Sequence, residues 1–176
     1  GLANRYRLND YSDKVLDYCY EHRLPLAMEI LDIDFFKQYN DNYGHQQGDE
    51  CIIAIADELK KMEDGQTFCA RYGGDEFIII YAGISAEEVH AKAGALRQNI
   101  MDLKLEHLYS KALPIVTISQ GISYGVPEEG NRSWDFLHTA DMLLYQVKKR
   151  SRNDICIADI RGQELDLSSK QEKVEP

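Results

Sequence analysis

The sequence lacks the usual features of a membrane, secreted or nucleic-acid-binding protein. No apolar run approaches the roughly 20 residues that a membrane-spanning helix needs. No signal peptide is visible in the opening Gly1-Leu2-Ala3-Asn4-Arg5, which has no Met, so we expect a domain of a longer protein. The 30 acidic residues outnumber the 20 basic ones, which gives a formal net charge of −10. This charge argues against nucleic-acid or membrane binding, but it allows a phosphorylated ligand held by metal ions and a few cations.

Paired cysteines are also missing, and the spacing of the four that are present argues against a zinc site. No two of the four cysteines form a CxxC pair, and three of them stand inside apolar periodic segments. Reduced, buried thiols of a cytosolic protein are therefore favoured. The cysteines are Cys19, Cys51, Cys69 and Cys156.

Helical and strand patterns alternate over a length that suits one domain. We expect a domain over 1–160 and a polar, solvated extension over 161–176. Expected helices are 9–22 (capped by Asn9 or Asp10), 34–44, one starting near 48, 85–105 with a capping box at Ser85 and Glu88, and 134–150. Expected strands are 24–32, 67–72, 77–81, 115–123 and 155–158. This mixture predicts a three-layer α/β sandwich or a one-sided α+β sheet.

The hairpin between the second and third expected strands carries two carboxylates. Gly73 and Gly74 predict a two-residue turn with positive φ, and Asp75 and Glu76 follow at once. The hairpin makes at least one strand pair antiparallel, so the sheet is mixed or mainly antiparallel. A glycine tip lets a bulky ligand approach the backbone, and the carboxylates can hold Mg²⁺. A plain turn is the alternative.

A second acidic cluster lies upstream, at Asp32 and Asp34. The strand is expected to end at Asp32 and a helix to begin at Asp34. The free amides of Phe35 and Phe36 at that helix start form a phosphate seat that Lys37 can reach. Together with the hairpin carboxylates, these are the parts of a metal-dependent phosphoryl-transfer site. A capped helix with a solvated lysine is the alternative, and an EF-hand is excluded because Lys37 occupies its glycine position.

Several motifs in order resemble the GGDEF domain of diguanylate cyclases over residues 1–158. The name-giving motif is 73–77, and 32–49 matches the family's DxDxFKxxND…GHxxGD pattern. Residues 1–5 resemble the end of its opening DxLTGLxNR motif, 116–119 its VTxS strand, and 140–153 its closing ADxALYxAKxxGRN helix. The resemblance implies an α/β (α+β) fold with a central, mixed, mostly antiparallel five-stranded sheet flanked by helices, as in the palm-like nucleotide cyclases and polymerases.

The resemblance also implies roles for single residues. The metal, Mg²⁺ with Mn²⁺ as an alternative, would be bound by Asp32, the Ile33 carbonyl, Asp75 and Glu76. The catalytic residues would be Asp75, Glu76 and Lys37. The substrate-binding residues would be Asn40 and Asp49 on the guanine edge, Phe35, Phe36, Gly73 and Gly74 beside the nucleotide, and Lys148 and Arg152 as an (i, i+4) clamp on the triphosphate. His45 either lines the nucleotide pocket or fixes its loop.

The implied reaction condenses two GTP molecules into cyclic di-GMP and two pyrophosphates. Because each domain would hold one GTP, a homodimer is required, if only a transient one. The implied setting is bacterial signal transduction in the cytoplasm, with a covalently linked sensory domain and with a membrane anchor of the parent protein left open. No nucleic-acid partner and no direct membrane contact are expected.

Three alternatives bear on this interpretation. A catalytically inactive GGDEF module could bind GTP or a partner and regulate a neighbouring domain, although the signature acids, Lys37 and Asn40 are all present. A cyclase acting on a single ATP is disfavoured because Asn40 and Asp49 suit guanine. The family's RxxD product-inhibition motif is replaced by Asp64-Gly65-Gln66-Thr67, so tight feedback binding there is not expected.

Overall fold

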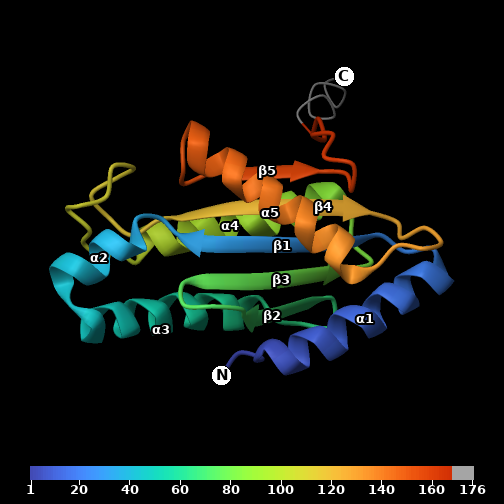
Figure 1. Cartoon of the computed structure of the whole chain (residues 1–176), viewed down its shortest axis with the longest axis horizontal. Coiled ribbons are helices and arrows are strands. Elements are labelled where there is room, and N and C mark those ends of the chain that lie inside the picture. Colours follow the sequence, from blue (N-terminus) through green and yellow to red (C-terminus); the bar gives the residue numbers. More distant parts are fainter. Residues whose placement is uncertain (168–176) are drawn as a thin grey trace, which may run out of the picture.

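A single five-stranded sheet organises the computed structural model, which describes residues 1–167 (Figure 1). The strand order is β2-β3-β1-β4-β5, with β4 and β5 parallel and the other neighbours antiparallel. This confirms the predicted mixed, mostly antiparallel sheet. The elements are α1 (Arg5–His22), β1 (Leu26–Ile33), α2 (Phe36–Tyr43), α3 (His45–Met62), β2 (Thr67–Arg71), β3 (Glu76–Ala82), α4 (Ala86–Asp102), β4 (Ile118–Gly125), α5 (Ser133–Arg150) and β5 (Ile155–Ala158).

The central strand β1 is buried along its whole length, as its unbroken apolar sequence predicts. Its side chains alternate between two cores. Ala27 and Leu31 pack with apolar residues of α3 and α4 on one face, whereas Met28 and Ile30 pack with those of α1 and α5 on the other. The sheet is therefore covered on both faces, which decides for the three-layer arrangement over the one-sided sheet.

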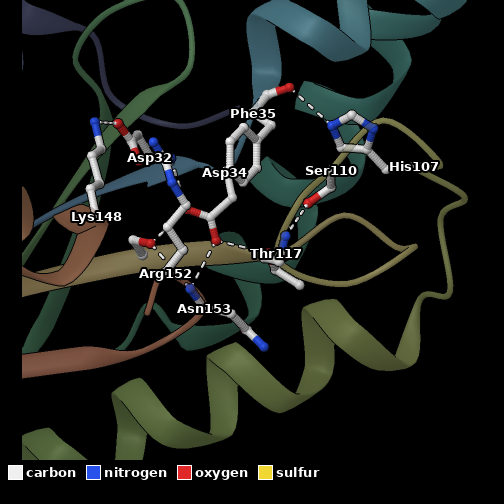
Figure 2. A network of polar contacts seen from close by, with 11 residues as sticks. Asp32, Asp34, Phe35, His107, Ser110, Thr117, Lys148, Arg152 and Asn153 are labelled. Carbon is white, nitrogen blue, oxygen red and sulfur yellow. Dashed lines mark hydrogen bonds and ion pairs between the residues drawn. The ribbon is translucent and has the colours of Figure 1, made fainter. Parts of the chain in front are cut away.

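Helix α5 lies unusually close to the sheet, and a glycine makes this possible. A Cβ atom at Gly121 of β4 would collide with the carbonyl of Ala140 and the amide of Leu144 on α5. Because Gly121 has no Cβ atom, the backbone of α5 packs directly against the backbone of β4. This contact aims the C-terminal turn of α5, which carries Lys148, at the end of β1 (Figures 1 and 2).

Several predicted element boundaries were wrong. Helix α1 starts at Arg5, because Asn4 is the cap and its Oδ1 accepts from the Arg7 amide at 3.0 Å. Helix α3 begins at His45, three residues before Gly48. The Ser85 cap is confirmed, with its hydroxyl 3.2 Å from the Glu88 amide. Helix α4 ends at Asp102 rather than 105, and β4 runs from Ile118 to Gly125 rather than over 115–123.

The hairpin loop also differs from the two-residue turn that the sequence predicts. Four residues, 72–75, separate β2 from β3, and neither Gly73 nor Gly74 has a left-handed φ. The Arg71 side chain shapes the loop by donating to the carbonyls of Gly73 (3.1 Å) and Gly74 (2.8 Å). The amides of Tyr72 and Gly73 both donate to the Glu76 carbonyl. Side-chain bracing therefore replaces the positive-φ turn.

The first part of the predicted solvated extension folds back on the sheet. The Leu165 amide donates to the carbonyl of Ile157 in β5 (3.0 Å), and Ala158 pairs with Glu164. Leu165 and Leu167 pack against the core on the α3 and α4 side. These two leucines could have indicated that the segment packs on the domain, although its overall composition is polar. The rest of the predicted extension, 168–176, lies outside the described residues.

The interior contains ionisable groups. All four cysteines are free and buried, as predicted, and burial raises the pKa of Cys51 to about 12. Glu29, in the middle of β1, is fully buried. Burial raises its pKa to about 8, although the Tyr81 hydroxyl, 2.8 Å from Oε1, partly opposes this by donating to it. No helix in residues 1–167 is both long and apolar enough to cross a bilayer.

Candidate active site

The two acidic clusters meet at one end of the sheet, as the sequence predicts. In the β1–β3 register Asp32 lies opposite Glu76, the first residue of β3. Asp75 immediately precedes it in the hairpin loop, half-buried and close enough that its charge raises the pKa of Asp32. Three carboxylates from two motifs more than 40 residues apart therefore share this edge.

Asp32 is the most deeply placed of the three, at 5% exposure. Its Oδ2 forms an ion pair with Lys148 of α5 (Figure 2), while its buried Oδ1 has no hydrogen-bond partner among the described residues. Burial raises the pKa of Asp32 to about 7; Lys148 opposes this shift, whereas the charges of Asp75 and Asp34 add to it. Burial also raises the pKa of Glu76, and the negative charge of Asp75 raises it further by a smaller amount. The edge thus gathers negative charge that one ammonium group does not balance.

The donor set at this edge fits a hard divalent cation. Among residues 1–167 no three carboxylate, imidazole or thiolate groups converge as a preformed metal cage. Mg²⁺ does not require one, because it usually binds one or two carboxylates together with water and substrate phosphates. The unpartnered Oδ1 of Asp32 and the half-buried Asp75 and Glu76 are oxygen donors of that kind. Asp32, Asp75 and Glu76 would hold the ion, and the backbone carbonyl of Ile33 stays a predicted further ligand.

Asp34 has a different place from the one expected. Helix α2 begins at Phe36, so Asp34 does not start it. Its carboxylate is fully buried and accepts from the hydroxyls of Thr117 (2.8 Å) and Ser119 (2.6 Å) and from the amide of Asn153 (3.0 Å). It therefore ties β1 to β4 and to the loop after α5 (Figure 2). In the sequence, this role could have been recognised from Thr117 and Ser119, two hydroxyl residues that an extended strand places on the same face.

Phe35 forms the turn between β1 and α2. It is left-handed, with φ 55° and ψ 38°, and it stands at the N-cap of α2. The guanidinium of Arg152 lies 4.1 Å from the centre of the Phe35 ring. The turn orients the Phe35 and Phe36 amides and leads into α2, which carries the exposed Lys37 and the half-buried Asn40.

The predicted helical clamp of Lys148 and Arg152 was wrong in geometry but not in location. Helix α5 ends at Arg150, and Arg152 is left-handed (φ 54°), so the two residues are not one helical turn apart. Nevertheless both reach the end of β1. Lys148 pairs with Asp32, and Nη1 of Arg152 lies 3.7 Å from Oδ1 of Asp34. The left-handed pair Arg152 and Asn153 turns the chain back toward Asp34.

The predicted guanine-reading residues lie on α2 and at the start of α3. Oδ1 of Asn40 is buried without a hydrogen-bond partner in the described part of the chain. It sits directly over Gly48, where a Cβ atom would collide with it. Gly48 is therefore required by the position of Asn40. Asp49 and His45 are exposed in the first turns of α3.

The segment 64–67, where the family's RxxD motif would stand, is occupied by an internal contact. Nζ of Lys92 on α4 lies 3.2 Å from Oδ2 of Asp64 and 2.9 Å from Oγ1 of Thr67. A hydrogen bond from the Gln66 amide lowers the pKa of Asp64, with Lys92 adding to the effect. The Asp64 carboxylate and the Thr67 hydroxyl are thus already paired within the domain.

Comparison with known proteins identifies the family. The family model described as "Diguanylate cyclase, GGDEF domain" matches residues 1–154. The chain belongs to the diguanylate cyclase GGDEF domain family. The predicted resemblance is thereby confirmed, and the GGDEF signature corresponds to the β2–β3 hairpin loop and the start of β3.

Individual relatives agree with this assignment. The chain is 34% identical over 156 residues to the probable diguanylate cyclase DgcC of Escherichia coli K12, a match covering 87% of this chain and 40% of the relative. It is 30% identical over 155 residues to the cyclic di-GMP phosphodiesterase NbdA of Pseudomonas aeruginosa, covering 88% of this chain and 19% of that protein. The chain therefore spans less than half the length of these relatives.

A solved structure supports the fold. The coiled coil and GGDEF domain of DgcB from Caulobacter crescentus, in complex with c-di-GMP, matches this fold with a TM-score of 0.80. The two sequences are 30% identical, and the match covers 89% of this GGDEF chain and 82% of that chain. This likeness confirms the palm-like α+β fold.

Proposed function

We propose that this GGDEF domain is a Mg²⁺-dependent diguanylate cyclase that condenses two GTP molecules into cyclic di-GMP and two pyrophosphates. The proposal rests mainly on one observation: Asp32 at the end of β1 lies beside Asp75 and Glu76 at the start of β3, and Lys148 pairs with Asp32. A site built of unbalanced carboxylates beside a helix start and two cations suits a metal-bound triphosphate better than any uncharged ligand. Membership of the family supports the same activity.

The substrate would be oriented by groups on both sides of this edge. Phosphates would contact the Phe35 and Phe36 amides and Lys37, and would compete with the carboxylates for Lys148 and Arg152. Asn40 and Asp49 would bind the guanine edge, since an asparagine amide can donate and accept and a carboxylate accepts from the N1 and N2 hydrogens of guanine. Mg²⁺, or Mn²⁺, when bound would neutralise charge on the phosphates.

The hairpin glycines have no internal reason to be glycine. Neither has a left-handed φ, and a Cβ atom would meet nothing closer than 3.8 Å at Gly73 and nothing within 4 Å at Gly74. The need for a bare backbone must then come from outside the domain. A nucleotide lying against the loop would supply that reason.

In the reaction, the 3′-hydroxyl oxygen of one GTP bonds to the α-phosphorus of the other as the bond to the β-phosphate bridge breaks. Pyrophosphate leaves, and we assign the hydroxyl proton to Asp75, the half-buried carboxylate of the loop. The same step with the roles exchanged closes the ring. Because one domain offers one such site, two copies must face each other. The parent protein would carry a linked sensory domain, and the free, buried cysteines agree with a cytoplasmic setting.

A regulatory module without turnover is the second candidate, favoured by the similarity to a relative named as a phosphodiesterase. One assay separates the two. The purified domain is incubated with GTP and Mg²⁺ at increasing protein concentration, and cyclic di-GMP is measured by chromatography. A cyclase gives product at a rate per domain that rises with concentration, because two domains must meet. GTP binding without product at any concentration would favour the regulatory module.

A further inference from the structure

His107, in the loop between α4 and β4, is fully buried against helix α2. The loop is closed at its base by the pairing of Glu106 with Ile115, and the His107 amide donates to the Pro114 carbonyl at 3.0 Å. The imidazole lies edge-on to the Tyr39 ring, with centroids 5.2 Å apart and planes at 90°. A polar ring is therefore held rigidly at the side of α2.

The imidazole makes a hydrogen bond to the turn that precedes α2. Its Nε2 lies 2.9 Å from the Phe35 carbonyl oxygen (Figure 2). A carbonyl can only accept, so Nε2 must carry the hydrogen. Nδ1 is buried and has no partner among the described residues, so this contact is the one hydrogen bond that the ring makes there. The same carbonyl accepts the first helical bond of α2, from the Tyr39 amide at 3.0 Å.

Phe35 needs external support because its backbone is unfavourable. A left-handed conformation costs a residue with a side chain about 1–2 kcal/mol, and glycine or asparagine is the usual occupant. On the β1 side the guanidinium of Arg152 lies over the Phe35 ring, and the preceding residue, Asp34, is anchored by the Thr117 hydroxyl. His107 is the contact that holds its carbonyl from the α2 side.

We propose that His107 is a positioning residue for the nucleotide: its Nε2–H fixes the Phe35 turn, so that the Phe35 and Phe36 amides and Asn40 meet the substrate together. The proposal rests on the proposed function, since it specifies how that site is aligned. His107 does not touch the substrate. It acts through the carbonyl of Phe35, and a turn that relaxes toward an ordinary conformation rotates the amides and α2 away from the bound geometry.

Two variants separate hydrogen bonding from packing. His107→Phe keeps a ring against Tyr39 but cannot donate, whereas His107→Gln loses the ring but carries an amide nitrogen at nearly the position of Nε2. Affinity is measured by calorimetry with Mg²⁺ and a GTP analogue whose α–β bridge is methylene, which cannot release pyrophosphate. We expect His107→Phe to weaken binding about five- to tenfold, the usual worth of one hydrogen bond, and His107→Gln to stay within about twofold of the parent. Leu108→Ala, at an exposed residue of the same loop, serves as the control.

A second readout does not depend on nucleotide or turnover. Hydrogen exchange of the Tyr39 amide, which donates to the Phe35 carbonyl, should be faster in His107→Phe and near the parent rate in His107→Gln. Failure of the parent to make cyclic di-GMP would count against the proposed function alone. Unchanged exchange in His107→Phe, or unchanged analogue affinity, would overturn the positioning role. Equal losses in both variants would also overturn it, because they would show that the ring acts only by packing.

Discussion

The buried carboxyl of Glu29 should make the stability of this domain depend on pH in a direction opposite to ordinary acid denaturation. Burial raises the folded-state pKa from the usual 4.5 to about 8. The folded state therefore keeps its proton over a range where the unfolded chain has released it. Stability from this group is fully present below pH 4.5 and falls as the pH rises toward 8.

The size of the effect follows from the two pKa values. They differ by about 3.5, and each unit is worth about 1.36 kcal/mol, so the total loss is of order 5 kcal/mol. At pH 7 the difference from 4.5 is 2.5, which corresponds to a loss of roughly 3 kcal/mol. Such a value is a large part of the stability of a domain of this size.

Glu29→Gln tests this reasoning directly. Glutamine has the same shape, does not ionise, and keeps an oxygen for the Tyr81 hydroxyl. Urea unfolding at pH 5, 6, 7 and 8 should show the variant gaining steadily in stability over the parent protein, by about 2.5 kcal/mol between pH 5 and 7. Glu21→Gln, at an exposed residue of α1, is the control and should follow the parent. Parallel pH profiles for Glu29→Gln and the parent would refute the account of the buried carboxyl.

Three further predictions concern the nucleotide site and its surroundings. Gly48→Ala should weaken GTP binding at least about tenfold in calorimetry, because the new Cβ displaces Oδ1 of Asn40. An equally tight complex would show that Asn40 does not bind the base. In competition binding GTP should displace ATP and not the reverse, since Asn40 and Asp49 match guanine, and equal affinities would count against that assignment. Titration with cyclic di-GMP should show no tight binding at Asp64 to Thr67, because Lys92 already pairs these residues; sub-micromolar binding that survives mutation of Asp49 would contradict this.

Much of the fold could be read from local patterns. The unbroken apolar run of β1 predicted a central strand, and the Ser85 capping box predicted the start of α4 to the residue. Errors arose where the sequence offered two equivalent choices or where a distant side chain decides. The cap of α1 is Asn4 rather than the predicted Asn9 or Asp10, although asparagine is a favoured cap residue at either position. The hairpin loop is shaped by Arg71 rather than by glycine conformation.

The candidate site shows the same division. Motif spacing brought Asp32, Asp75 and Glu76 together correctly, because strand ends in register must meet. The buried partners escaped notice, since each is defined by contacts across more than 70 residues of sequence. Asp34 depends on the hydroxyls of Thr117 and Ser119 at the start of β4, and His107 reaches Phe35 from a loop with no motif of its own.

The central claim is that Asp75 works with Asp32 in a cyclase that makes cyclic di-GMP. The most direct measurement compares the parent domain with Asp75→Asn in GTP and Mg²⁺, followed by chromatography for cyclic di-GMP, with Asp57→Asn on the exposed side of α3 as a matched control. Loss of a charged group that binds the metal or takes the proton should cost several kcal/mol of transition-state stabilisation, about a thousandfold in rate, while the melting temperature stays near that of the parent. Asp57→Asn should form product at the parent rate. Product formation by folded Asp75→Asn at that same rate would contradict the account.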